Sequence, residues 1–247
     1  MKISLRGRIK KIADFIFPRQ CVMCEMINPK GKFDFICPDC AREIPICKAG
    51  KCLRCGEIIG GIGSPDADGC PKCAGVQIAY RRALCPALFA GCARELIHAL
   101  KYQKKIYAAR DLAKIAMLHP DTARFLDGAA LVPVPITRKK RIARGYNQAE
   151  AIIREIVRQG KLGCKVVGAL KRVEQAGTQT TLDRARRIKN VEKAFELSAA
   201  AKNLDKNARI IICDDVITTA ATINECAKVL RKAGFKNLYA FALAKRM

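Results

Sequence analysis

The sequence predicts an α/β fold: a mainly parallel sheet with flanking helices, preceded by a small cysteine-rich domain. After about residue 75, short apolar runs alternate with stretches of helical periodicity, as in open parallel sheets. Before that point the chain is rich in cysteine, proline and glycine and has little helical periodicity. We therefore expect a basic amphipathic helix over residues 1–20, a cysteine-rich domain over 21–75 and an α/β domain over 80–247.

The N-terminal segment interleaves apolar residues with Arg and Lys. It lacks the unbroken apolar stretch of a secretory signal, and no run approaches the roughly 18 apolar residues of a membrane span. We therefore expect a cytoplasmic protein whose first helix packs on the protein body. A helix lying on a membrane surface, which would make the protein peripheral at the membrane, is the alternative.

The charge balance is strongly positive, with 47 Lys and Arg against 22 Asp and Glu and a net charge of +25. Such a charge predicts attraction to polyanions, which include nucleic acids, phosphorylated metabolites and anionic membranes. It does not choose between them.

Eight of the 14 cysteines form four CxxC pairs, arranged in two consecutive sets. Twelve residues separate the pairs of the first set and fourteen those of the second. Two such knuckles complete a tetrahedral thiolate site, so we expect two structural zinc ions; a crossed pairing of the knuckles and a redox dithiol role are the alternatives. The remaining six cysteines are expected to be small buried hydrophobes. The expected zinc ligands are Cys21, Cys24, Cys37 and Cys40, and Cys52, Cys55, Cys70 and Cys73.

Apolar runs and periodicity predict the elements of the α/β domain in order. The first strand, 83–90, contains Pro86 and is therefore confined to a sheet edge. RIIIC, at 209–213, is a continuous β-branched run, typical of a strand covered on both faces. Residues 171–190 show no clear pattern. Further strands are expected at 130–136, 166–170 and 238–244, and helices at 93–118, 147–158 and 221–234.

Two acids and several threonines follow the 209–213 strand, in IIICDDVITTAATI (210–223). In open parallel sheets, ligands bind at the carboxyl ends of the strands. The N–H groups of a helix start, together with threonine hydroxyls, form a phosphate-sized cup. Asp214 and Asp215 can accept hydrogen bonds from sugar hydroxyls or help to hold magnesium, so a sugar phosphate meets both demands. The alternative is a threonine-capped helix with the acids near its dipole.

The same stretch, CDDVITTAATINE, resembles the phosphoribosyl-diphosphate (PRPP) signature of type I phosphoribosyltransferases, V-x-T-T-G-A-T after an acid pair. VPVPITRKKRIARGYNQAEAI (132–152) looks like the second motif of the ComF family of competence-associated proteins, a PVP turn followed by RGxNQ. LKRVEQAGTQTTLDRARRIKNVEKAFEL (170–197) is also similar to that family, which carries an N-terminal double zinc ribbon. The resemblance spans essentially the whole chain and implies a double zinc ribbon followed by a type I phosphoribosyltransferase-like domain.

The resemblance also implies a role for individual residues. Asp214 and Asp215 would hold the ribose hydroxyls and serve catalysis, and 171–190 would form a mobile flap that includes Asn190. Ala220 replaces the signature glycine, and its methyl group is harmless at negative φ but crowded at positive φ, by roughly 1 kcal/mol or more. The implied PRPP-binding residues are Asp214, Asp215, Thr218, Thr219, Ala220, Ala221, Thr222, Lys101, Arg138 and Lys139, and the candidates for nucleic-acid or flap contacts are Arg141, Arg144, Arg172, Gln179 and Arg187.

The function implied is that of a PRPP-binding protein acting in DNA uptake, transformation or the use of external DNA, with single-stranded DNA contact. Its cofactors would be two zinc ions and magnesium with PRPP, and its partners single-stranded DNA and competence or helicase proteins. The alternative is an active phosphoribosyltransferase that releases pyrophosphate and modifies a small-molecule acceptor in nucleotide metabolism. His98 and His119 match no metal spacing and are expected to pack or cap.

Overall fold

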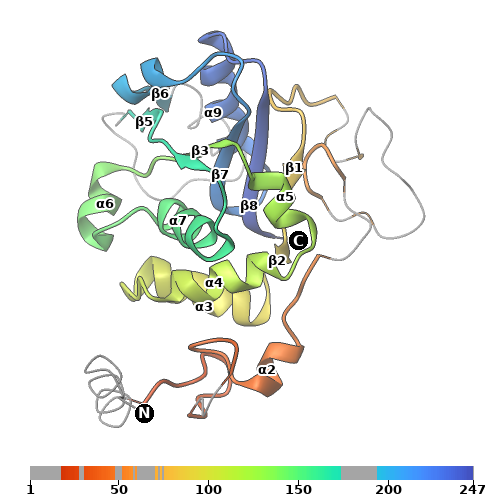
Figure 1. Ribbon diagram of the computed structural model, residues 1–247, viewed down its shortest axis with the longest axis vertical. Helices are drawn as coiled ribbons and strands as arrows, with labels where there is room; N and C mark the ends of the chain where they lie inside the picture. The colour runs from red at the N-terminus through yellow and green to blue at the C-terminus, as the bar shows by residue number, and fades with distance from the viewer. Residues whose placement is uncertain are drawn as a thin grey trace.

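The computed structural model describes residues 18–27, 31–47, 52–57, 59, 70, 71, 73, 75–173 and 194–246, so most of the expected N-terminal helix lies outside the described residues. Within them, six strands form one sheet in which every pairing is parallel. The order is β1-β8-β7-β3-β4, and β2 also pairs with β8 (Figure 1). The strands are β1 (Ala83–Leu84), β2 (Ala87–Leu88), β3 (Ala130–Pro133), β4 (Lys165–Val166), β7 (Ile210–Ile217) and β8 (Leu238–Lys245).

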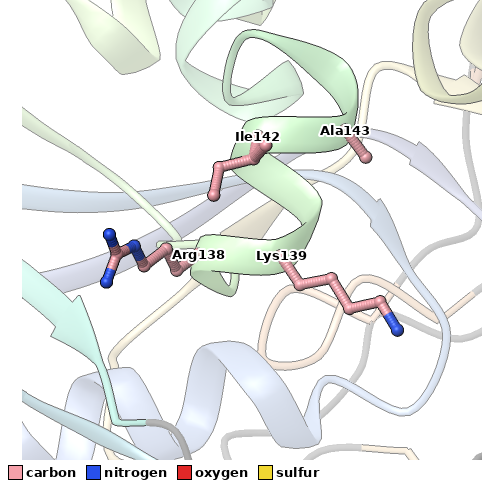
Figure 2. Close-up of a pocket in the computed structure, with 4 residues that line it drawn as sticks. All are labelled: Arg138, Lys139, Ile142 and Ala143. Carbon is pink, nitrogen blue, oxygen red and sulfur yellow. The ribbon is translucent and has the colours of Figure 1, made fainter.

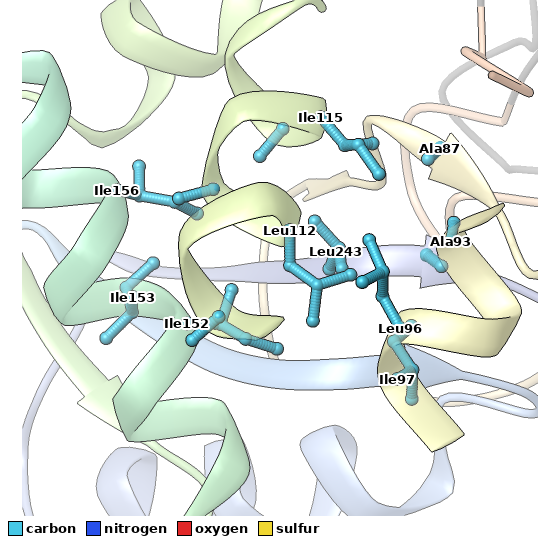
Figure 3. Packing of buried hydrophobic residues seen from close by; sticks show 14 of the residues in the cluster. Ala87, Ala93, Leu96, Ile97, Leu112, Ile115, Ile152, Ile153, Ile156 and Leu243 are labelled. Atoms are coloured by element: carbon cyan, nitrogen blue, oxygen red, sulfur yellow. The ribbon is translucent and has the colours of Figure 1, made fainter. Parts of the chain in front are cut away.

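Helices cover both faces of this sheet. Because side chains alternate along a strand, Ile211 and Leu243 point into one core, and Ile210 and Ile212 into the other. Figure 3 shows the first core, where helix side chains pack around Leu243. That core contains α3 (Gly91–Tyr102), α4 (Ala108–Met117), α5 (Asp121–Leu126) and α7 (Gln148–Gly160). The second core contains α9 (Ala221–Lys232), η1 (Ala199–Asn203) and a small antiparallel sheet of β5 (Leu170–Arg172) and β6 (Phe195–Leu197).

This architecture confirms the predicted mainly parallel sheet with flanking helices. Pro86 interrupts the predicted first strand, which becomes β1 and β2 beside β8. The 130–136, 147–158, 221–234 and 238–244 predictions correspond to β3, α7, α9 and β8. Gly234 follows α9 with φ +91°, a left-handed conformation that glycine adopts readily.

Three predicted elements differ from the structure. The single helix expected over 93–118 is two helices, because the chain turns at residues 103–107, where Lys104 has φ +55°. The run 166–170 is split between β4 and β5, which belong to different sheets. The 209–213 strand continues to Ile217 because β8 pairs with it as far as Lys245, so both acids lie inside the strand.

Besides α5, two α-helices among the described residues were not predicted. The segment TRKKRIAR (137–144), rich in Arg and Lys, forms α6 (Arg138–Arg144). The Thr137 side chain caps its N-terminus, and Gly145, with φ +85°, ends the helix. The first cysteine set contains α2 (Pro38–Arg42), which lies beneath α3 and α4 in Figure 1. Both sequences are short and lack an apolar stripe, so their periodicity gave no indication of a helix.

Candidate functional site

The acid pair lies at the carboxyl end of the central strand β7. Asp215 is 4% exposed, and its Oδ2 forms an ion pair with Lys101 Nζ at 2.5 Å. Lys101 comes from the last turn of α3, so the fold brings together two predicted site residues that are more than a hundred positions apart. Asp214 is partly exposed, and its Oδ1 accepts a hydrogen bond from the Asp215 N–H at 2.8 Å.

Asp214 is the electrostatically strained member of the pair. Burial of its carboxyl group, followed by the negative charge of Asp215, raises the pKa of Asp214 well above its usual range, although Lys101 acts in the opposite direction. Burial and the charge of Asp215 therefore disfavour ionisation of Asp214, and Lys101 opposes this effect. A cation or the hydroxyl donors of a ligand would stabilise the ionised form of Asp214, and carboxylate oxygens are the ligands that magnesium prefers.

The turn after β7, residues 218–222, which we call the ligand turn, presents hydroxyls beside an open helix end. Thr218 and Thr219 are exposed and Thr222 is half-buried. Ala220 occupies the N-cap position of α9, and no side chain caps the helix there. The capped-helix alternative is therefore wrong: neither threonine serves as the N-cap, and the first N–H groups of α9 have no side-chain acceptor from this position.

Ala220 has φ +61° and ψ +2°, a left-handed conformation. The methyl group of Ala220 is therefore crowded, because a non-glycine residue at this positive φ costs about 1–2 kcal/mol. Strain of this kind persists only where the surrounding contacts hold the backbone. The glycine of the signature would adopt the same turn without that cost.

Lys140 of helix α6 interacts electrostatically with Asp215. Desolvation lowers the pKa of Lys140, and the nearby charges of Arg172, Arg144 and Lys101 lower it further, whereas Asp215 raises it. These interactions place Lys140 among the cations around the acids, a position that the sequence analysis missed. Nothing in the run TRKKRIAR distinguishes Lys140 from its neighbours.

Arg138 and Lys139 line an open depression of about 460 Å³ together with Ile142 and Ala143. Figure 2 shows the two cationic side chains extending in opposite directions from the start of α6. Arg141 is exposed on the same helix. The depression is open, and its lining combines two cationic side chains with two apolar ones.

The RGYNQ segment of the family motif holds helices together. The Asn147 side chain caps α7 and donates to the Val134 carbonyl, and Tyr146 Oη donates to the Leu100 carbonyl at 2.6 Å. Arg144 donates to Gln148 and lies 5.7 Å from the ring centroid of Tyr102, which is 70% exposed. Tyr102 is thus the aromatic ring that this region exposes.

The flap candidates divide between described and undescribed residues. Arg172 ends β5, where its guanidinium lies over the Phe195 ring at 5.2 Å and interacts electrostatically with Lys140. Gln179, Arg187 and Asn190 lie outside the described residues.

Cysteines form two clusters, each able to hold a metal ion. The first cluster contains Cys21, Cys24, Cys37 and Cys40, the second contains Cys52, Cys55, Cys70 and Cys73, and the four Sγ atoms of each lie within 4.8 Å of one another. In the first cluster Cys24 Sγ lies 3.7 Å from Cys37 Sγ, and in the second cluster three Sγ–Sγ separations are 3.6–3.8 Å. A tetrahedral zinc ion with Zn–S bonds of about 2.3 Å requires an edge of about 3.8 Å, so both clusters fit zinc. The predicted pairing of the knuckles is confirmed, and the crossed pairing is wrong.

The remaining titratable candidates are structural. The His98 ring packs between Phe89 and Tyr102, and His119 Nδ1 accepts the Asp121 N–H, as expected for packing and capping residues. Of the six other cysteines, all are buried except the half-buried Cys164. No helix among the described residues is long and apolar enough to cross a membrane.

Comparison with known proteins finds relatives that are named for competence and for DNA utilization. No protein-family model matches the chain. The chain is 30% identical over 226 residues to "Competence protein F" of Haemophilus influenzae, a match that covers 86% of this chain and 98% of that protein. It is 27% identical over 235 residues to "DNA utilization protein YhgH" of Escherichia coli K12, covering 93% and 98% of the two chains. "Competence protein ComFC" of Streptococcus pneumoniae is 27% identical over 114 residues, 46% of this chain and 47% of that one.

Proposed function

The chain belongs to the ComF family of competence-associated proteins, and from this premise we propose that it binds PRPP with magnesium and acts in DNA uptake or in the use of external DNA. The observation that carries the PRPP part is the Lys101–Asp215 ion pair beside Asp214, directly before a turn of exposed threonines. This arrangement offers acceptors for hydroxyls and donors for phosphate within one strand-to-helix connection.

Each part of PRPP has a matching group. Asp214 and Asp215 accept hydrogen bonds from the ribose 2- and 3-hydroxyls. The hydroxyls of the ligand turn and the first N–H groups of α9 surround the 5-phosphate, where the helix dipole favours negative charge. Lys140 and Lys101 interact electrostatically with Asp215 and would supply positive charge for the pyrophosphate. Arg138 and Lys139 lie on the same helix as Lys140. A magnesium ion would stabilise the ionised carboxylate of Asp214 and neutralise part of the pyrophosphate charge.

Transfer is the second candidate activity. The bond between the anomeric carbon and the pyrophosphate oxygen would break, and pyrophosphate would leave with the electron pair. An acceptor nitrogen or oxygen would bond to the carbon and release its proton to solvent. Cations around Lys140 would stabilise the charge on the leaving group. Ala220 acts against this activity, because its strained backbone carries a methyl group where the signature glycine lets a phosphate approach closely.

A titration with magnesium and PRPP tests the binding proposal. Asp214→Asn and Asp215→Asn should each lose at least about tenfold in affinity, since hydrogen bonds to charged groups contribute about 1.5–3 kcal/mol. Asp121→Asn, an exposed aspartate in the first turn of α5, is the matched control and should bind as wild type does. Wild type that fails to bind, or Asp214 and Asp215 variants that bind equally well, would reject the site. Pyrophosphate release followed in the same samples separates a binder from a transferase.

Contact with single-stranded DNA is supported by α6 and Tyr102. Five cations occupy eight residues at 137–144, and the exposed Tyr102 ring lies beside Arg144. A strand could therefore place phosphates along α6 and stack one base on Tyr102. Tyr146 is the less suitable ring, because its hydroxyl is bound to Leu100.

Salt dependence of DNA affinity tests this part separately. Arg141→Gln should weaken binding and reduce the slope of log affinity against log salt by about 0.7, because the variant neutralises one phosphate fewer. Lys236 is an exposed lysine just before the amino end of β8, so it lies at the opposite end of the strands from the proposed site. Lys236→Gln should leave the affinity and the slope unchanged. Tyr102→Leu should cost roughly tenfold in affinity, whereas Tyr102→Phe keeps the stacking face. A flat slope in wild type would refute phosphate contact.

A further inference from the structure

We propose that Lys245 is a positioning residue that couples the metal-bound form of the second cysteine cluster to the shape of the ligand turn. Lys245 ends β8 and is 2% exposed. Its Nζ lies 2.9 Å from Glu57 Oε2 and donates to the Thr218 carbonyl at 2.5 Å. A buried ammonium group is costly unless it is paired and hydrogen-bonded, so these two contacts fix the side chain.

The carboxylate end of this bridge belongs to the second cysteine cluster. Glu57 follows Cys55 by two positions, and its carbonyl accepts the Cys52 N–H at 2.7 Å. Gly56, between them, has φ +76° and donates to the Cys52 carbonyl at 2.8 Å. The knuckle that presents Cys52 and Cys55 to the metal is therefore the same loop that positions Glu57.

The carbonyl end of the bridge sets the direction of an N–H group in the ligand turn. In a planar trans peptide the carbonyl and the following N–H point in opposite directions. Because Lys245 binds the Thr218 carbonyl from inside the protein, the Thr219 N–H is turned the other way, away from Lys245. A change at Lys245 would release this peptide plane, and the next residue, Ala220, is already held in a left-handed conformation.

A second link reaches the turn from its other side. Asn224 in α9 is 9% exposed; its Oδ1 accepts the Ala79 N–H at 2.7 Å, and its Nδ2 donates to the Gln77 carbonyl at 2.9 Å. Gln77 and Ala79 lie in the segment that leaves the cluster after Cys73. The Asn224 N–H in turn donates to the Ala220 carbonyl at 2.9 Å. The second cluster is thus linked to the ligand turn at two points, through Lys245 at the Thr218 carbonyl and through Asn224 at the Ala220 carbonyl.

The turn's role as a PRPP site rests on the proposed function, so the test uses a readout that needs no PRPP. Hydrogen exchange of residues 218–222 is measured in the zinc-loaded full chain. Lys245→Met and Glu57→Gln should each speed exchange in this segment roughly tenfold, the size expected for removal of a hydrogen bond to a charged group. Lys114→Met is the matched control, because Lys114 makes the corresponding ion pairs beside the first cluster, with Asp34 and Asp111.

Single-ligand substitutions supply the metal arm of the test. Cys55→Ser should speed exchange at 218–222, whereas Cys24→Ser should leave it unchanged. Equal effects of the two serine variants, or unchanged exchange in both Lys245→Met and Glu57→Gln, would overturn the proposal. If wild type fails to bind PRPP but exchange responds as expected, the coupling stands and the proposed ligand alone is rejected.

Discussion

The two cysteine clusters share a spacing and a geometry but differ in what they contact. In the first cluster Cys24 is exposed and Cys40 half-buried, and the surrounding apolar residues pack into the core of α3, α4 and α7. In the second cluster all four cysteines are buried, and Ile78 connects them to the core of α9 on the opposite face of the sheet. The ligand spacing alone therefore predicts that each cluster binds zinc. It does not predict which part of the protein each cluster stabilises.

The anchors of the clusters make the same distinction. Asp111, fully buried in α4, accepts the Asp34 and Phe35 N–H groups at 2.7–2.9 Å, and Lys114 bridges Asp34 and Asp111 at 2.9 Å each. This network fastens the first cluster to a helix. The Glu57–Lys245 pair fastens the second cluster to the ligand turn. We infer a scaffolding role for the first and a positioning role for the second.

Removing a metal ligand is expected to have the largest effect and tests the comparison most severely. Metal binding in small zinc domains is worth on the order of 10 kcal/mol. Cys55→Ser should therefore lower the zinc content from the two ions expected for the two clusters toward one and reduce the free energy of unfolding. Cys24→Ser, at an exposed ligand, should reduce it less. Metal analysis and urea unfolding check both, and a larger reduction in Cys24→Ser would reverse our ranking.

Breaking the anchor of the first cluster should come next. Asp111→Ala leaves the Asp34 and Phe35 N–H groups without their acceptor and leaves Lys114 paired with Asp34 alone. Each buried polar group that loses its hydrogen-bond partner costs about 1–3 kcal/mol. Urea unfolding should show this cost, while hydrogen exchange at 218–222 remains that of wild type. Faster exchange in the ligand turn would mean that both clusters are coupled to it.

Neutralising Asp214 should affect stability and binding in opposite directions. Because the pKa of Asp214 is raised, the folded chain holds this proton more tightly than the unfolded chain. Stability therefore falls as pH rises from the usual aspartate pKa of about 4 toward the raised value. The free energy of unfolding of Asp214→Asn should not fall in this way, so this variant should be more stable than wild type near neutral pH. It should nevertheless bind PRPP more weakly. Unfolding free energies over about pH 5–8, with Asp121→Asn as control, check the prediction; a parallel pH dependence in Asp214→Asn contradicts it.

The smallest effect concerns the strained backbone. Ala220→Gly should stabilise the protein by about 1 kcal/mol, because φ +61° costs an alanine what it does not cost a glycine. Ala221→Gly, one position later and inside α9, should instead destabilise it by about 0.5–1 kcal/mol. Thermal unfolding of the two variants measures the difference. Equal destabilisation would mean that Ala220 is unstrained in solution.

Much of the fold follows from local patterns in the sequence. A β-branched run predicted β7, an apolar run predicted β8, apolar spacing predicted α7 and α9, and the CxxC spacings predicted both metal clusters with their pairing. The errors occurred where apolar periodicity carried no information about where a helix ends or whether it forms. The 93–118 helix breaks at a left-handed Lys104, and α6 forms through its caps without an apolar stripe.

The site was less accessible to sequence reasoning. The acids and the turn follow one another along the chain, so a motif could place them, and the resemblance placed Lys101 beside them. Lys140, Glu57, Asn224 and Lys245 carry no motif, because their partners lie far away in sequence. Lys245 is typical: as the last residue of an apolar strand it looks like an ordinary exposed end, and its burial is visible only in the folded chain.

The central claim is that Lys245 holds the ligand turn in the shape that binds PRPP. The most direct test is hydrogen exchange of residues 218–222 with and without magnesium and PRPP, in wild type and in Lys245→Met. We predict that PRPP slows exchange of this segment in wild type, and that Lys245→Met starts from faster exchange and needs roughly tenfold more PRPP for the same protection. Exchange that PRPP leaves unchanged in wild type, or that is the same in Lys245→Met as in wild type, would contradict the claim.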